Sequence, residues 1–263
     1  MKGAPILEVW NVSKAFGGVN ALRDVSFAIR SAGIHSLIGP NGAGKTTLFN
    51  VIGGINVPTS GSVLLKGTDV SGWAPNKLAV CGVSRTFQNL QIFTQMTAIE
   101  NVMVGAHLRL DFRLIAGMMK LPAFRRRDVE ADAEARRLID FVGLAAFADR
   151  VTAHMPFGAL KRLEIARALM ARPQLLLLDE PAAGLNQGEK VQLQTLIRTI
   201  AKEGINVLLV EHDMKLVMNL SDHIIVLANG CKLAEGKANE IRNDPDVIAA
   251  YLGRPAKVTK VDV

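Results

Sequence analysis

The chain has 263 residues, of which 49% are hydrophobic and 21% charged, a composition that supports a packed core and excludes a disordered chain. Its net charge is +7, but only 5% of its residues are aromatic, which leaves little for stacking on single-stranded bases and argues against nucleic acid as a partner. No stretch reaches the roughly 18 uncharged residues of a membrane helix, and the N-terminus lacks the apolar core of a signal peptide, so we expect a cytosolic protein.

Apolar runs of strand length alternate with helical patterns, which predicts an α/β fold. Near the N-terminus the runs look like strands separated by turns, at residues 6–12, 25–29 and 62–67. Four later runs are denser in Leu, Ile and Val, as in a parallel sheet covered on both faces, at residues 34–39, 174–180, 205–213 and 223–230. Residues 89–172 carry helical periodicity, so we predict a helical insert in the α/β body. Residues 254–263 have no periodicity and are expected to form a loose tail.

The stretch GPNGAGKTT matches the phosphate-binding pattern G-x-x-x-x-G-K-[ST], with a strand pattern before it and a helix pattern after it. Its glycines let successive backbone N–H groups point at phosphate oxygens, and the helix N-terminus adds its dipole. The lysine is placed for the β- and γ-phosphates and the first threonine for Mg²⁺. A chance glycine-rich turn is the alternative. The predicted ATP-binding residues of this loop are Gly39, Pro40, Asn41, Gly42, Ala43, Gly44, Lys45, Thr46 and Thr47.

The leucine-rich run at 174–180 ends in two acidic residues. At such a strand end Asp179 can hold Mg²⁺, and Glu180 can polarise an attacking water; the alternative is a pair of solvated acids that cap the strand. His212 ends another strand pattern and could bond the γ-phosphate or the water, although a lone histidine there is more often structural. Gln88 could reach Mg²⁺ with its amide, but a lone glutamine carries little signal.

These motifs occur in the order found in ATP-binding-cassette (ABC) ATPases, namely GPNGAGKTT, RTFQN, LLLLDEP, AAGLN and EHD. The resemblance covers about residues 7–253, and the strings KRLEIARAL, DEPAAGLN and IRNDPDVIAAYLG are similar to the LivG-type ATPases of branched-chain amino acid importers. It implies the α/β P-loop NTPase fold of ABC ATPases, with an N-terminal antiparallel β subdomain, a parallel-sheet core and a helical subdomain insert. We therefore expect one nucleotide-binding domain over residues 1–253, with its insert at about 89–172, and ATP and Mg²⁺ as cofactors.

The resemblance also assigns roles to single residues. Phe16 falls where the family places an aromatic ring that stacks on adenine; the alternative is a core phenylalanine. Gln88 falls where the family couples the nucleotide to the membrane subunit, and His212 falls at its switch histidine. Asn186 lies in the loop that crosses to the partner ATPase.

The segment MPFGA, at residues 155–159, lies at the signature motif, which in this branch resembles LSYGQ. Pro156 replaces the serine whose hydroxyl would donate to the γ-phosphate of the partner's ATP, and Ala159 replaces the glutamine, whereas Gly158 survives. Proline is tolerated near a helix start, so we expect the local fold to hold. The predicted signature contacts are Pro156, Phe157, Gly158 and Ala159, and a composite site built with them is expected to turn over slowly.

The resemblance implies an ATPase that powers uptake of branched-chain amino acids or related small polar solutes from the cytoplasmic face of the inner (plasma) membrane. Its implied partners are a LivF-type second ATPase or a second copy of this chain, two integral membrane permeases and, indirectly, a periplasmic or extracellular solute-binding protein. A soluble ABC protein of DNA repair or translation is one alternative. Repair proteins of this type carry long coiled-coil inserts and translation factors carry two cassettes, and the sequence shows neither feature, which argues against this alternative. A nucleotide-binding regulator that hydrolyses nothing is another; the altered signature favours it and Glu180 opposes it.

Overall fold

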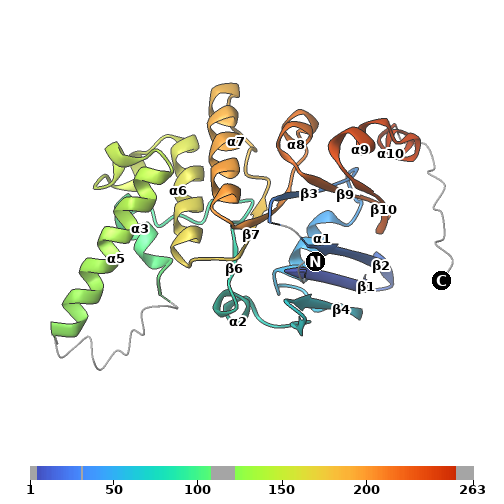
Figure 1. The fold of residues 1–263 in the computed structure, drawn as a ribbon, viewed down its shortest axis with the longest axis horizontal. Coiled ribbons are helices and arrows are strands. Elements are labelled where there is room, and N and C mark those ends of the chain that lie inside the picture. The colour runs from blue at the N-terminus through green and yellow to red at the C-terminus, as the bar shows by residue number, and fades with distance from the viewer. Residues whose placement is uncertain (1–4, 31, 108–121, 253–263) are drawn as a thin grey trace. The chain divides into compact units, whose positions relative to one another are not determined.

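The computed structural model describes residues 5–30, 32–107 and 122–252, and the predicted tail at 254–263 lies outside them. The chain forms two compact units, residues 1–78 with 197–263, and residues 79–196. Figure 1 shows the course of the chain through both. Among the described residues no helix combines the length and the apolar character needed to cross a bilayer.

The first unit contains an antiparallel sheet in the order β2-β1-β4-β5. Its strands are β1 (Leu7–Phe16), β2 (Val19–Ile29), β4 (Ser60–Leu65) and β5 (Thr68–Asp69). Figure 1 shows β1, β2 and β4 side by side, in agreement with a register that pairs Leu7 with both Ile29 and Leu65. Alternate residues of β1 are buried at its start, which is typical of a sheet that is covered on one face.

The same unit contains a parallel group in which β3 (Ile34–Ile38) pairs with β8 (Asn206–Val210) and with β9 (His223–Ala228). All five residues of β3 and of β8 are buried, as the dense Leu, Ile and Val runs predict for strands covered on both faces. An antiparallel strand, β10 (Cys231–Gly236), completes this group beside β9. The sequence did not predict β10, because its polar and half-buried residues lack the period of a strand.

Four helices of the first unit follow these strands. Helix α1 follows the glycine-rich loop after β3, α8 follows β8, and α9 and α10 follow β10. Their bounds are α1 (Lys45–Ile52), α8 (Met214–Leu220), α9 (Ala238–Asn243) and α10 (Pro245–Tyr251). A core cluster that includes Ile38, Val217 and Val226 packs α8 against the parallel strands. This packing fixes the ends of β3 and β8, which are followed by the glycine-rich loop and by His212.

The second unit holds the short parallel pair β6 (Val83–Arg85) and β7 (Leu175–Asp179). Between them the regular structure of the described residues consists of helices and one isolated bridge between Thr97 and Val151, joined by turns and coil. The helices here are α3 (Ala98–Val104), α5 (Pro122–Phe141) and α6 (Phe157–Met170), and α7 (Gln187–Lys202) begins in this unit; α2 (Pro75–Val80) lies where the first unit gives way to the second. The division of the chain into one domain with an insert at 89–172 stays a prediction.

Candidate functional site

The glycine-rich loop connects β3 to α1 in the first unit. A Cβ atom on Gly39 would lie 2.1 Å from the backbone oxygen of Leu227, and the residue has φ of 152°, so only glycine fits there. Helix α1 then starts after Gly44 with no acidic residue in its first turn. The N-terminal end of α1 therefore carries a partial positive charge, which suits an anion.

Lys45 folds back over this loop. Its Nζ donates hydrogen bonds to the carbonyl oxygens of Gly39, at 2.8 Å, and Pro40, at 2.9 Å, and only 5% of the residue is exposed. The two carbonyls hold the ammonium group at the loop without neutralising its charge. A phosphate that entered the loop would meet a cation that is already in place.

A cavity of about 280 Å³ lies over the loop. Its lining includes Asn41 to Thr47 and, from the segment after β8, the exposed His212. Thr46 is exposed and Thr47 half-buried, whereas Ala43 packs inward. The loop and the histidine, which the sequence predicted as separate motifs, thus line one cavity.

Phe16 ends β1 with 47% of its surface exposed. The ammonium group of Lys14 lies 4.9 Å from its ring centroid. The alternative of a core phenylalanine is therefore wrong, and the exposed ring is available for stacking.

In the second unit, Asp179 is the last residue of β7 and is 5% exposed. Its Oδ2 accepts a 2.8 Å hydrogen bond from Nη2 of Arg85, which ends the neighbouring strand β6. The Asp179 N–H also donates to Oγ1 of Thr86 at 3.4 Å. Because this carboxylate is buried and paired, the alternative of a solvated strand cap does not apply to Asp179.

Glu180 and Gln88, both predicted site residues, contact each other. Nε2 of Gln88 donates to Oε2 of Glu180 over 3.2 Å, and Gln88 is exposed while Glu180 is half-buried. Glu180 has φ of 47°, in the left-handed region that non-glycine residues rarely occupy. Backbone strain of this kind costs about 1–3 kcal/mol and is concentrated at functional sites.

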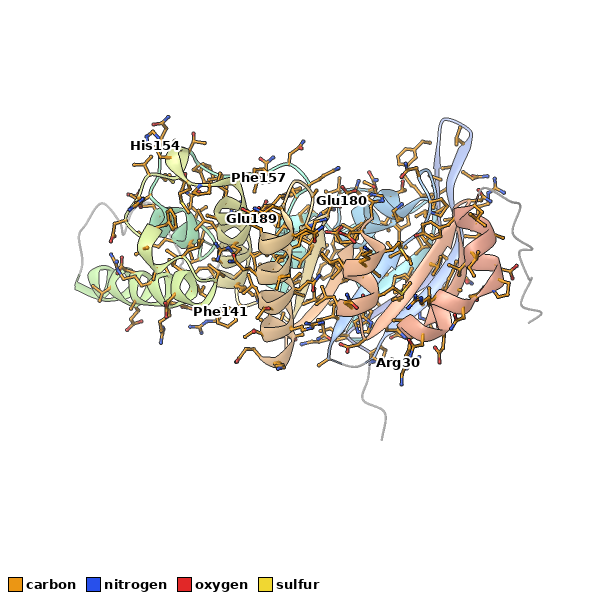
Figure 2. All side chains as sticks on the ribbon, turned by 90° about the horizontal axis from the view of Figure 1, so that it is seen from above. Arg30, Phe141, His154, Phe157, Glu180 and Glu189 are labelled. Carbon is orange, nitrogen blue, oxygen red and sulfur yellow. The ribbon has the colours of Figure 1, made fainter. Side chains whose placement is uncertain are left out.

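The predicted signature segment surrounds the start of α6. Pro156 is the N-cap residue and donates no hydrogen bond, and the next residue, Phe157, is 48% exposed. A Cβ on Gly158 would lie 2.3 Å from Oε1 of Glu189, so any larger residue there would displace this carboxylate. Figure 2 labels Phe157, the first residue of α6, and Glu189, in the first turn of α7. Ala159 is 4% exposed, so its methyl group faces the interior, and the surface positions of the segment are Pro156 and Phe157.

Asn186 caps the start of α7. Its Oδ1 accepts from the N–H of Glu189, while Oε2 of Glu189 accepts from the N–H of Asn186, both at 3.0 Å. This reciprocal pair is a capping box, which the spacing of Asn186 and Glu189 could have predicted. Asn186 is exposed and has this structural role within the chain. Its contact with a partner ATPase stays a prediction.

Two buried charged residues of α6 hold the loop that carries Gln88. Nζ of Lys161 donates to the carbonyl oxygen of Gln88 at 3.2 Å, and Oε1 of Glu164 accepts from the N–H of Phe87 at 3.3 Å. Burial raises the pKa of the Glu164 carboxyl above its ordinary value, against the Phe87 N–H and the Lys161 charge, which lower it. The helix that begins at the predicted signature segment is thus bonded to the loop that carries Gln88.

A glycine loop between a buried parallel strand and a helix, with a lysine folded over it, defines a P-loop nucleotide-binding protein. The buried strand that ends in two acids adds the second element of an ATPase in this class. The description "ABC transporter" belongs to the family model that matches residues 22–183, more than half of the chain. A second model, described as "Branched-chain amino acid ATP-binding cassette transporter", matches residues 231–257. The chain belongs to the ABC transporter ATPases.

Relatives and solved structures agree with this assignment. The chain is 48% identical over 250 residues to the high-affinity branched-chain amino acid transport ATP-binding protein BraF of Pseudomonas aeruginosa, covering 95% of this chain and 98% of that protein. It is 44% identical to LivG of Escherichia coli over the same shares. The ADP conformation of an ATP-binding cassette of an ABC transporter superposes with a TM-score of 0.82 at 32% identity, covering 95% of this chain and 99% of that one. A nucleotide-free cassette gives 0.82 at 33% identity, with 94% and 98% covered. The predicted α/β ABC ATPase fold is confirmed.

Proposed function

We propose that this chain is the ATP-hydrolysing subunit of an ABC importer that takes up branched-chain amino acids. The observation that carries the proposal is the 44–48% identity, over 95% of the chain, to ATP-binding proteins named for that transport. The match of residues 231–257 to the branched-chain model extends the likeness beyond the ATPase motifs. Solutes chemically related to these amino acids are the second candidate cargo.

Each part of the site has a role in this reaction. The loop amides and Lys45 bind the ATP phosphates, and Phe16 stacks on the adenine. Glu180 accepts a proton from the attacking water, Gln88 positions Glu180 through their hydrogen bond, and His212 bonds the γ-phosphate. The strained backbone of Glu180 fits the role of a residue that is held in one orientation.

The donors of the site fit Mg²⁺. The hydroxyl of Thr46, the amide oxygen of Gln88 and the carboxylate of Asp179 are oxygen ligands, which this ion prefers. Among the described residues no group of three or more His, Cys, Asp or Glu side chains gathers as a metal site, which fits an ion bound mainly through nucleotide phosphates. When bound, the ion neutralises charge that develops on the phosphates.

We further propose that the chain works in an asymmetric pair with a LivF-type ATPase. Pro156 is exposed at the start of α6 and supplies neither a hydroxyl nor a backbone N–H to a partner's nucleotide. Glu180, Gln88 and His212 act on this chain's own ATP, which the partner's signature completes. The alternative is a homodimer in which both composite sites contain Pro156.

The remaining partners follow from the proposed transport function. Two integral permeases bind the ATPase pair at the cytoplasmic face of the inner membrane, and a solute-binding protein delivers cargo from the other side. This chain is a peripheral subunit in that assembly.

Tagging the chain in its native host and identifying what co-purifies from gently solubilised membranes tests the proposal. We expect two permeases and a second ATPase with an intact signature. Permeases with this ATPase alone would replace the asymmetric pair by a homodimer. Recovery from the soluble fraction without permeases would contradict the transport function.

A serine at position 156 tests the effect of the altered signature. Because Pro156 is exposed and N-terminal to α6, Pro156→Ser restores a hydroxyl donor and also gives α6 a favourable N-cap residue, so folding is preserved. A charge-assisted hydrogen bond of about 1.5–3 kcal/mol would raise steady-state ATP turnover of the assembled complex by about 10-fold or more.

The control for this variant is Pro156→Ala, which restores the backbone N–H without the hydroxyl and separates the two donors. Ala159 is left unchanged because its side chain is buried, so that a glutamine there would also disturb packing. Equal turnover of the wild type and Pro156→Ser would show that position 156 does not limit either site.

A further inference from the structure

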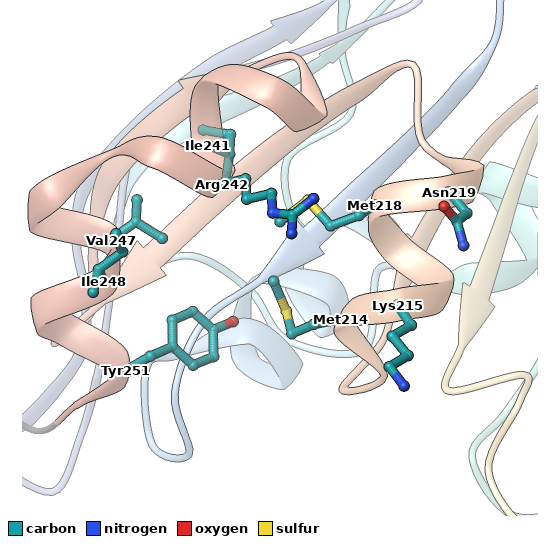
Figure 3. Close-up of a pocket in the computed structure, with 9 residues that line it drawn as sticks. All are labelled: Met214, Lys215, Met218, Asn219, Ile241, Arg242, Val247, Ile248 and Tyr251. Carbon is teal, nitrogen blue, oxygen red and sulfur yellow. The ribbon is translucent and has the colours of Figure 1, made fainter.

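A groove separates α8 from α9 and α10 in the first unit, and nothing in the ATPase reaction uses it. It encloses a cavity of about 470 Å³, within the range of small-molecule sites. Figure 3 shows its nine lining residues, with Arg242 extending from α9 towards Met218 on α8 and the Tyr251 ring pointing from α10 towards Met214.

The walls of the groove are apolar. Ile241, 2% exposed, and Val247, 4% exposed, belong to the core cluster, and Met214 and Met218 pack against that cluster. Ile248 is 46% exposed at the rim. Thioether side chains adapt to the shape of an apolar ligand, so two methionines in one wall suit a compact aliphatic group.

The charge of the groove is positive. Lys215 and Arg242 are its charged lining residues, and none of the nine residues is acidic. Three acids near the groove in sequence are engaged in helix caps: Asp213 accepts from two N–H groups of α8, Asp244 accepts from two of α10, and Glu240 accepts from the Lys237 N–H. A fourth, Asp246, lies in the first turn of α10 and does not line the cavity. An apolar cavity with two cations complements an anion with an aliphatic body.

Both sides of the groove are connected to the phosphate loop. Helix α8 begins at Met214, two residues after His212, which lines the cavity over the loop. On the other side, burial raises the pKa of the Tyr251 hydroxyl and the backbone of Gly39, the first residue of the loop, lowers it, which places this hydroxyl beside the loop. A molecule that spaces α8 from α10 therefore acts on two groups that surround the ATP phosphates.

We propose that this groove binds a small aliphatic monocarboxylate, with its carboxylate at Arg242 and its chain against Met214 and Met218, and that binding changes the nucleotide affinity of the phosphate loop. A free amino acid fits less well, because the groove has no acid to pair with an ammonium group. The chain's own residues 253–263 are also a poor match, since they carry the cations Arg254, Lys257 and Lys260 against the single acid Asp262. The effect on nucleotide rests on the proposed ATP site, whereas carboxylate binding does not.

Carboxylate binding is measured first, without nucleotide. The probes are 4-methylpentanoate, its neutral amide and leucine, added to the full-length chain carrying [¹³C-methyl]methionine. We expect the Met214 and Met218 methyl signals to shift with a Kd of about 1 mM or tighter for the carboxylate, and at least about 10-fold weaker binding of the amide and of leucine. Arg242→Gln should weaken carboxylate binding by about 10-fold, while the matched control Lys202→Gln, an exposed cation of α7, stays within about two-fold of wild type.

Equal binding of the carboxylate and its amide, or no shift of these two methyl signals at about 10 mM carboxylate, would overturn the proposal. Tighter binding of leucine would replace the carboxylate by an amino acid. The effect on nucleotide is measured next, as the change in ADP affinity between zero and saturating carboxylate. We expect at least about a three-fold change that Tyr251→Phe removes while carboxylate binding persists. A carboxylate that binds without changing ADP affinity would refute the coupling; an absence of ADP binding in every sample would instead count against the proposed ATP site.

Discussion

Replacing Glu180 by Gln should lower ATP hydrolysis by the assembled complex by at least about 100-fold and leave ATP binding within about three-fold of wild type. In the wild-type chain Nε2 of Gln88 lies 3.2 Å from Oε2 of Glu180. The glutamine of the variant keeps an amide oxygen that can accept this hydrogen bond, so the local geometry survives. It cannot accept a proton from water, and general-base catalysis contributes about 10²–10⁴ in rate. Phosphate release and equilibrium binding of a fluorescent nucleotide measure the two quantities.

Glu203→Gln is the control for this experiment, because it removes an exposed carboxylate from the residue that follows α7. It should leave both quantities unchanged. A Glu180→Gln complex that hydrolyses ATP at the wild-type rate would exclude Glu180 as the base. A variant that loses ATP binding as well would assign Glu180 a binding role.

Replacing Lys45 by Met should weaken ATP binding to the chain by about 10- to 100-fold, which corresponds to the loss of a charge-assisted hydrogen bond of about 1.5–3 kcal/mol. The Met side chain fills the space of the lysine stem but offers no donor to a phosphate. Titration calorimetry with ATP and Mg²⁺ measures the affinity.

The same substitution leaves the carbonyl oxygens of Gly39 and Pro40 without the lysine donor, so the unfolding midpoint must be recorded beside the affinity. Lys77→Met, at an exposed position of α2, controls for the loss of one positive charge. Unchanged ATP affinity in a folded Lys45→Met chain would show that the ammonium group does not meet the phosphates.

The elements that position the site were predictable because their burial leaves a strong pattern. Four dense runs of Leu, Ile and Val correspond to β3, β7, β8 and β9, whose residues are buried throughout apart from the half-buried His223 at the start of β9. The strand β10 was not predicted, since an edge strand with half-buried residues needs no such run. The burial of Lys161 and Glu164 in α6 was not predicted, because it depends on backbone partners in the loop that carries Gln88.

The contacts between site residues were less predictable. The ion pair of Arg85 with Asp179 joins residues 94 positions apart, and nothing in the local pattern of either strand indicates it. Gly158 was predicted as a signature contact, and the sequence did not indicate that Oε1 of Glu189 would lie 2.3 Å from the position of a Cβ there. Such partners depend on tertiary packing, which spacing in the sequence does not specify.

Two hydrogen bonds connect α6 to the loop that carries Gln88, and neither depends on the residue at the N-cap of α6. Lys161 and Glu164 lie past the first turn of α6, so the exchange of a hydroxyl for a proline ring at its N-cap leaves both bonds in place. A subunit with a slow composite site can then still pass a displacement of this helix to Gln88. In the proposed asymmetric pair, a proline at the predicted signature is therefore compatible with full participation in the motions of a transporter, in which one site would drive the cycle and the other would set its timing.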